Sequence, residues 1–285
     1  MNQYFPENQC DLSCIAETDV APRVSWPRYA WRRTAMAGTH GLAWLLGVVS
    51  TLCSRRVGAR LLQVWARAYV KSTGVCVEIS GELTLSKPAL VVSNHMSSLD
   101  GMVLVAEHPF VVVARDELSR HPIVGRLLRN AGMIFVRQGS LASLRDLITS
   151  ITTGLQRGDS VLAFPEGTIR CSPPGGQFSS SVMQAAIDAR VPVRPVLMWC
   201  ELADGRPTSR ASWLGTEPLR QSLQRIQRIR GLVLKVHVLP DIEPDDVGNR
   251  GELARMARQS IVAAVLHSPV TCQANRPSDM VEVNS

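Results

Sequence analysis

The chain has 285 residues, of which 45% are hydrophobic, and a formal net charge of +7. This length and composition allow a substantial buried core, so we expect one large domain with a smaller appendage. The seven cysteines form no C-x-x-C pair, which argues against a disulfide framework and a zinc knuckle and favours reduced, mostly packing thiols in a cytosolic setting. The first thirty residues carry acids and prolines in place of a basic start and an apolar core, so we expect no secretory signal.

Residues 1–25 are polar and aperiodic, and we predict a disordered tail there. The segment that follows is strongly basic. No acidic residue occurs between Asp19 and Glu78, whereas eight arginines, one lysine and four of the six tryptophans do. Basic residues interleaved with tryptophan suit an anionic surface, which is either a nucleic acid or a membrane.

An uncharged run of 21 residues, 34–54, decides between these two surfaces. A helix needs about 20 apolar residues to span a bilayer, whereas a nucleic-acid-binding face has no use for such a run. We therefore predict a membrane-embedded or membrane-lying helix, with a single span left open and a buried helix of the globular domain as the alternative. Apolar residues recur at near-helical spacing over 55–73 and stop at Gly74, so residues 26–73 are predicted to form a basic, amphipathic, membrane-associating helical hairpin.

Over residues 74–266, short apolar runs alternate with helical patterns. The runs predict strands at 75–80, 89–93, 110–114, 132–137, 160–164, 191–198 and 232–239. The helical patterns are clearest at 117–130, 140–156, 179–189 and 248–266. Apolar strands separated by helices indicate an α/β domain with a largely parallel mixed sheet flanked by helices. The polar segment 267–285 is predicted to be a loose tail.

A histidine and an aspartate follow one of these strands, at the place where functional groups gather in open α/β sheets. His95 comes directly after "ALVVS", and Asp100 is expected in the first turn of the next helix, with Ser97 or Ser98 as its N-cap. A carboxylate beside an imidazole fixes its tautomer and stabilises the imidazolium, so the pair suits a general base that activates a hydroxyl. We expect no metal here, because no neighbouring histidine or cysteine cluster offers a third ligand, and the chain has no G-x-S-x-G elbow.

Three more strand ends carry polar or irregular features. "FPEGT" places Glu166 and Gly167 after a strand, where glycine lets backbone N–H groups approach a ligand and the carboxylate can position an arginine or bind hydroxyls. Arg137 ends "GMIFVR" and suits an anionic head group. The segment 191–199 carries two prolines, which predicts an edge strand or an irregular wall.

Taken in order, "NHMSSLD", "GMIFVR", "FPEGT" and "VPVRPV" resemble the four motifs of the glycerolipid acyltransferases. The nearest branch is the 1-acyl-glycerol-3-phosphate (lysophosphatidic acid) acyltransferases, and the resemblance covers about residues 75–200. It implies that His95, oriented by Asp100, removes the proton from an acceptor hydroxyl as this hydroxyl attacks an acyl thioester. The acyl group would then pass directly to the acceptor, without an acyl-enzyme.

The resemblance also implies the roles of other residues and the partners. Arg137 and the loop residues Glu166, Gly167, Thr168 and Arg170 would hold the polar head of the acceptor. The donor would be acyl-coenzyme A or acyl-carrier protein as a co-substrate, with no cofactor and no metal. The acceptor is a membrane lipid, so a membrane-associated enzyme at the cytoplasmic face of the cell membrane is expected, and no nucleic acid.

Two departures from the family pattern bear on the acceptor. Ile169 stands where the family often has an arginine, and "FSSSV" (178–182) stands where it often has a basic F-K-x-G patch. Since a charge-assisted contact to phosphate contributes about 1.5–3 kcal/mol, another lysolipid such as lyso-ornithine lipid stays open beside 1-acyl-glycerol-3-phosphate. A lipid- or thioester-binding membrane protein without turnover and a thioester hydrolase are further alternatives.

Overall fold

The computed structural model describes residues 10–11, 14–15, 19–83, 87–137, 141–171, 176–215 and 217–267. Its helices are α1 (Trp26–Val49), η2 (Ser50–Leu52), α2 (Arg55–Thr73), α3 (Asp100–Glu107), α4 (Asp116–Ser119), α5 (Gly125–Asn130), α6 (Leu141–Gln156), α7 (Ser180–Ala189), α8 (Leu219–Arg228), η3 (Pro244–Asp246) and α9 (Arg250–His267). Its strands are β1 (Cys76–Ser80), β2 (Leu90–Ser93), β3 (Val111–Arg115), β4 (Ile134–Val136), β5 (Val161–Ala163), β6 (Val193–Leu202) and β7 (Leu232–Val238). All seven predicted strands are present, and the tail predicted over 267–285 lies outside the described residues after His267.

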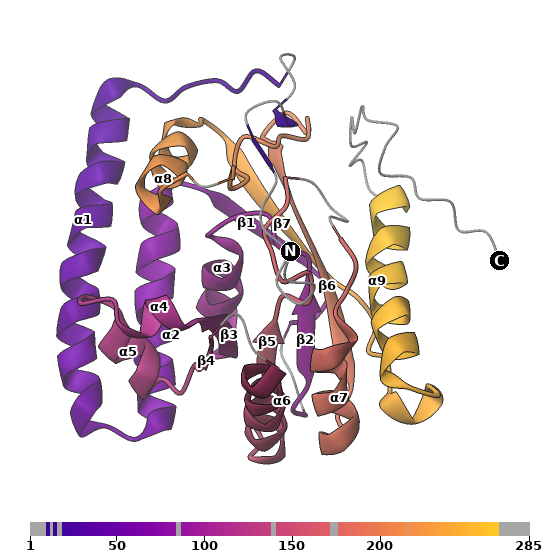
Figure 1. The fold of residues 1–285 in the computed structure, drawn as a ribbon. Helices are drawn as coiled ribbons and strands as arrows, with labels where there is room; N and C mark the ends of the chain where they lie inside the picture. The colour runs from indigo at the N-terminus through magenta and orange to yellow at the C-terminus, as the bar shows by residue number, and fades with distance from the viewer. Residues whose placement is uncertain are drawn as a thin grey trace.

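The strands form one sheet in the order β1-β7-β6-β2-β5-β3-β4. Neighbours pair in parallel except β6 and β7, which are antiparallel, so the predicted largely parallel mixed sheet is confirmed. Helices α2, α3 and α8 cover one face and α6, α7 and α9 the other (Figure 1), which is why continuous apolar strands are tolerated. The carboxyl ends of β2, β5, β3 and β4 meet along one edge of the sheet.

Strand β6 lies between β7 and β2, so the edge position that its prolines suggested is wrong. Pro195 fits an interior strand because the ladder with β7 begins one residue later, at the pair Val196–Val238. The carbonyl of Pro195 still accepts the N–H of Leu239 at 3.0 Å. The missing N–H of proline therefore removes no bond from the ladder.

The single helix expected over 117–130 is instead two short helices, α4 and α5. Pro122 lies in the turn between them and disfavours the helical conformation of the residue before it. The guanidinium of Arg129 in α5 donates to the carbonyl of Ser119 and so ties the two pieces together.

The first two helices form the predicted hairpin and run side by side (Figure 1). Helix α2 ends at Gly74, whose φ of 74° lies in the left-handed region that glycine favours. Leu62 and Trp65 of α2 are buried, and the indole N–H of Trp65 donates to the carbonyl of Thr39 at 2.9 Å. The inner face of the hairpin thus joins the core of the sheet domain, and the predicted boundary at residue 74 stays a prediction.

Arg32 belongs to the basic N-terminal segment, yet it is buried against the sheet domain. Its guanidinium donates to the carbonyls of Gln227 and Ile229 at 2.8 and 3.0 Å and to that of Gly74 at 3.1 Å. These hydrogen bonds connect α1 to the end of α8, so Arg32 is not available to bind an anionic surface.

Residues 19–25 belong to the segment that we expected to be disordered, but they follow a defined course. The N–H of Val24 donates to the carbonyl of Arg228 at 2.9 Å, and Asp19 accepts the hydroxyl of Thr208 at 2.8 Å. These bonds hold the N-terminal segment beside the loop that follows β6.

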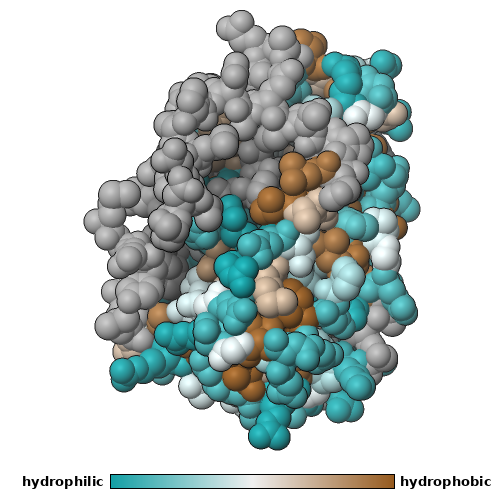
Figure 2. All heavy atoms as spheres, turned by 90° about the vertical axis from the view of Figure 1, so that its right-hand side faces the viewer, coloured by the Kyte–Doolittle hydropathy of each residue, from teal (hydrophilic) through white to brown (hydrophobic). Residues whose placement is uncertain are grey.

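The outer face of α1 is apolar and exposed. Trp26, Trp31 and Trp44 are 78%, 71% and 58% exposed, and Leu52 of η2 is 90% exposed. Within the described ranges, one helical stretch, Trp26–Leu52, is long and apolar enough to cross a membrane, judged by length and composition alone. Figure 2 shows the α9 side, where the described surface is mostly hydrophilic with small apolar groups; α1 lies across the sheet from it (Figure 1).

Candidate active site

The imidazole of His95 and the carboxylate of Asp100 meet at the carboxyl end of β2. The distance from Nδ1 of His95 to Oδ2 of Asp100 is 2.9 Å. The side chain of His95 is 22% exposed and that of Asp100 is fully buried. Because Nδ1–H donates to the carboxylate, Nε2 is left as the basic nitrogen.

Asp100 also organises the turn that carries the histidine. Its Oδ2 accepts the backbone N–H groups of Met96 and Ser97 at 2.6 and 2.8 Å, and its Oδ1 accepts the hydroxyl of Ser97 at 2.8 Å. Asp100 is in the first turn of α3, as predicted, but the N-cap residue is Leu99, so the expected serine cap is wrong. Ser97 instead accepts the N–H of Leu99 at 3.1 Å and closes a side-chain turn.

Two further residues that we did not single out in the sequence hold His95 in place. The side-chain amide of Asn94 exchanges two bonds of 2.8 Å with the backbone of Met198 in β6, which fixes the end of β2 against its neighbour. The ring of Phe164 stacks on the imidazole, with 4.0 Å between centroids and 19° between planes. Both residues belong to the motif segments "NHMSSLD" and "FPEGT", which is the signal that could have identified them.

The loop after β5 brings Glu166, Gly167, Thr168 and Arg170 to the histidine. Gly167 has a φ of 68°, so the chain reverses there, and its N–H donates to the backbone carbonyl of Phe164 at 3.1 Å. The N–H of Arg170 then donates to the carbonyl of His95 at 2.8 Å. The structure thus brings the loop that carries four of the five predicted head-group residues to the His95–Asp100 pair, and their role in binding stays a prediction.

Glu166 is a buried acid with unused hydrogen-bonding capacity. It is 4% exposed, and among the described residues neither carboxyl oxygen has a partner within hydrogen-bonding distance. Burial raises the pKa of Glu166 to about 8, against the opposing effect of the nearby guanidinium of Arg170. Such an unpartnered group is costly in a native core unless it serves a ligand.

Replacing Glu166 by glutamine is expected to flatten the pH dependence of stability. In the unfolded chain this carboxyl ionises near its ordinary pKa of 4.5, but in the folded protein it ionises near 8. Between these values the folded state holds a proton that the unfolded state has lost, so stability falls as pH rises, by up to about 1.4 kcal/mol per pH unit. Urea unfolding of the parent and of Glu166→Gln in detergent micelles, from pH 6 to 8.5, measures this; parallel curves would contradict the burial effect.

The structure does not bring Arg137 to His95. It follows β4, the edge strand, and β3 and β5 lie between β4 and β2, so the two strands are about 14 Å apart at a spacing of about 4.8 Å. Its side chain is 76% exposed and reaches Asp116 at 3.8 Å. Arg137 lies at the carboxyl ends of the strands, as His95 does, and its role in binding the head group stays a prediction.

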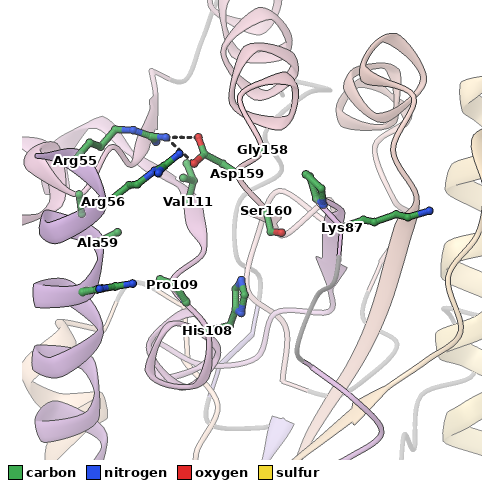
Figure 3. A pocket seen from close by; sticks show the side chains of 13 residues that line it. Arg55, Arg56, Ala59, Lys87, His108, Pro109, Val111, Gly158, Asp159 and Ser160 are labelled. Carbon is green, nitrogen blue, oxygen red and sulfur yellow. Dashed lines mark hydrogen bonds and ion pairs between the residues drawn. The ribbon is translucent and has the colours of Figure 1, made fainter.

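A basic hollow of about 320 Å³ lies at the amino ends of the strands, on the side of the sheet opposite to the carboxyl ends where His95 lies. In Figure 3, Arg55 and Arg56 reach from α2 toward Asp159, and Arg55 forms an ion pair with it at 2.5 Å. Lys87, His108 and Ser160, which also line the hollow, precede β2, β3 and β5. Because His95 follows β2 and the loop with Glu166 follows β5, at the other ends of these strands, this hollow is separate from the His95–Asp100 pair.

The fold and the pair define the class of protein: an α/β protein with a histidine–carboxylate pair at the carboxyl end of a strand of its sheet. The Acyltransferase family model matches residues 74–199. The "Lyso-ornithine lipid O-acyltransferase" of Pseudomonas aeruginosa is 32% identical over 218 residues, which are 76% of this chain and 83% of that protein. This chain therefore belongs to the acyltransferase family, and the family resemblance of its motifs is confirmed.

Two further proteins are similar to this chain. The "1-acyl-sn-glycerol-3-phosphate acyltransferase" of Neisseria gonorrhoeae is 29% identical over 176 residues, covering 62% of this chain and 69% of that protein. The crystal structure of the 1-acyl-sn-glycerophosphate (LPA) acyltransferase PlsC from Thermotoga maritima matches with a TM-score of 0.63 at 16% identity, covering 85% of this chain and 97% of that one. The match to this crystal structure establishes the fold of the present chain.

Proposed function

We propose that this protein is a lysolipid O-acyltransferase that moves a fatty acyl group from an acyl thioester to 1-acyl-glycerol-3-phosphate, giving phosphatidic acid. The observation that carries the proposal is the His95–Asp100 pair, 2.9 Å apart, beside the buried carboxyl of Glu166, whose two oxygens have no partner among the described residues. An acceptor hydroxyl and the polar groups around it supply the partners that this site lacks.

The reaction follows from the geometry of the pair. Nε2 of His95 removes the proton of the acceptor hydroxyl while the hydroxyl oxygen attacks the thioester carbonyl. The buried carboxylate of Asp100 stabilises the imidazolium that forms. Collapse of the tetrahedral intermediate breaks the carbon–sulfur bond, and the leaving thiolate takes the proton back from the imidazolium, so the enzyme is regenerated without a covalent intermediate.

The loop residues Glu166, Gly167, Thr168 and Arg170 hold the polar head of the acceptor in this proposal. Arg170 supports the assignment because its buried Nε has no hydrogen-bond partner within the part of the chain that the structure describes. A phosphate or carboxylate next to the reacting hydroxyl would accept from that N–H, and Glu166 would accept from a donor of the head group. Arg137 would add a second, more distant cation.

Lyso-ornithine lipid is the second candidate acceptor. Ile169 replaces a cation in the loop, and Arg137 is directed toward Asp116, so less positive charge faces the site than a phosphomonoester favours. The relative of this name in Pseudomonas aeruginosa supports the same acceptor. The anionic group of lyso-ornithine lipid is a carboxylate, which one arginine can bind.

The donor in this proposal is acyl-coenzyme A or acyl-carrier protein, and the enzyme associates with the cytoplasmic face of the cell membrane. The exposed tryptophans of α1, interleaved with arginines, support association with a membrane surface. An enzyme seated there meets a lipid acceptor without drawing it fully into water.

The test is an acyl-transfer assay in lipid micelles with labelled acyl-coenzyme A and, separately, labelled acyl-carrier protein. Each donor is offered lysophosphatidic acid or lyso-ornithine lipid. Label in phosphatidic acid supports the first acceptor, and label only in ornithine lipid supports the second. Free fatty acid formed without an acceptor would indicate a hydrolase, and an intact thioester in every reaction would overturn the proposal.

Arg137→Ala is expected to raise KM for the acceptor by about 10-fold with little change in kcat, because the lost charge-assisted contact contributes about 1.5 kcal/mol to binding. Arg120→Ala is the matched control, since Arg120 is also exposed and also pairs with Asp116, at 2.7 Å. Acceptor titrations at saturating donor measure both variants. Equal KM values for the two would remove Arg137 from the acceptor site.

A further inference from the structure

Three cysteines from distant parts of the chain converge beside the catalytic loop. The Sγ atoms of Cys10, Cys14 and Cys171 all lie within 4.8 Å of one another. Cys171 directly follows Arg170, whose N–H is bonded to His95. The sequence offered no sign of this cluster, because about 160 residues separate Cys10 and Cys14 from Cys171.

The local geometry stabilises negative charge on sulfur. The backbone N–H of Cys171 donates to Sγ of Cys10 at 3.2 Å, and the N–H of Cys14 closes a turn onto the carbonyl of Asp11 at 3.1 Å.

We propose that Cys10, Cys14 and Cys171 form a three-thiolate site for a zinc-class metal ion. Zinc binds thiolate sulfur at about 2.3 Å in tetrahedral geometry, which places sulfurs about 3.8 Å apart. Sulfurs that already lie within 4.8 Å of one another reach this spacing with shifts of about 1 Å or less. Water fills the fourth position, and the thiol protons pass to solvent on binding.

The surroundings suit such a site. Three thiolates and one divalent cation carry a net charge of −1, which the neighbouring guanidinium of Arg170 balances. The carbonyl of Cys171 accepts the hydroxyl of Ser212 at 3.0 Å, and the next residue, Trp213, donates its N–H to Met96 at 2.8 Å. The cluster therefore lies among the loops that close over the carboxyl edge of the sheet.

The metal would have a structural role. It would join the segment that contains Cys10 and Cys14 to the loop that carries Glu166 and Arg170, and it would restrain that loop relative to His95. Metal binding itself does not depend on the acyl-transfer chemistry, so the metal site can be tested independently of the proposed function.

The test uses the full, tag-free chain, reduced, freed of metal with a chelator and then exposed to zinc alone or cobalt alone. After gel filtration, the parent is expected to retain about one metal ion per chain, and cobalt to give thiolate-to-metal charge-transfer absorption. Cys10→Ser, Cys14→Ser and Cys171→Ser should each weaken binding by about 10-fold or more. Cys76→Ser is the matched control, because Cys76 is exposed on β1, at the far end of the sheet from β4.

Circular dichroism of each variant separates loss of the ligand from loss of the fold. Zinc should raise the melting temperature of the parent and of Cys76→Ser, and leave that of Cys171→Ser unchanged. Less than about a tenth of an equivalent of metal in the reconstituted parent, or equal binding by all the variants, would overturn the site. A disulfide between any two of the three cysteines that persists after treatment with the reductant would overturn it as well.

Discussion

His95→Ala is expected to lower kcat/KM for acyl transfer by about 10²–10⁴-fold, the usual contribution of a positioned general base. The remaining groups of the site still bind the head group, so KM for the acceptor should change much less than kcat. The fold should survive, because His95 is partly exposed at the end of β2 and its backbone carbonyl, not its side chain, receives the bond from Arg170. The loss is therefore a chemical one.

Initial rates with labelled donor, at saturating acceptor, measure this loss. His108→Ala is the matched control, since His108 lies in the hollow at the amino ends of the strands and, among the described rings, contacts only that of Phe110, in a tilted arrangement. It should keep a rate close to that of the parent. Transfer by His95→Ala at the parental rate would remove the histidine from the mechanism.

The sheet could be predicted from the sequence because its strands are buried on both faces. Runs such as Leu90–Val92 and Val161–Ala163 are continuously apolar. A serine and an asparagine follow the first run, and Phe164 and a proline that breaks the strand follow the second. The adjacency of His95 and Asp100 was predictable for a related reason. Five residues of turn and the first turn of a helix leave the two side chains little freedom to separate.

Features that depend on long-range placement could not be predicted. The sequence of β6 shows Pro195 but not the point at which β7 joins the ladder, which decides whether an interior proline is tolerated. Arg137 directly follows strand β4, yet only the strand order reveals that two strands separate it from His95. Spacing along the chain likewise says nothing about the approach of Cys171 to Cys10.

Glu166 shows a further limit. The sequence places a carboxyl in a turn after Pro165, where solvent exposure would be the ordinary expectation. The structure buries it beside the catalytic pair and raises its pKa to about 8. Burial of this kind depends on the loops packed over the edge of the sheet, which no local pattern encodes.

Asp100→Asn is expected to reduce both activity and stability. The fully buried carboxylate accepts three N–H groups on Oδ2 and one hydroxyl on Oδ1. An amide that turns its oxygen toward the three donors keeps those contacts without the charge, so kcat should fall by about 10²-fold or more as imidazolium stabilisation is lost. Weakening the charge-assisted bonds should lower the free energy of unfolding by about 1.5–3 kcal/mol.

Urea unfolding and initial rates on the same preparations separate the two effects, with Asp188→Asn, an exposed acid on α7, as the control. His95→Ala should lose activity with little change in stability, whereas Asp100→Asn should lose both. The difference follows from burial: the imidazole makes one bond to the carboxylate, but the carboxylate also holds the N–H groups of Met96 and Ser97 that shape the turn. Full stability in Asp100→Asn would show that its carboxylate serves the chemistry alone.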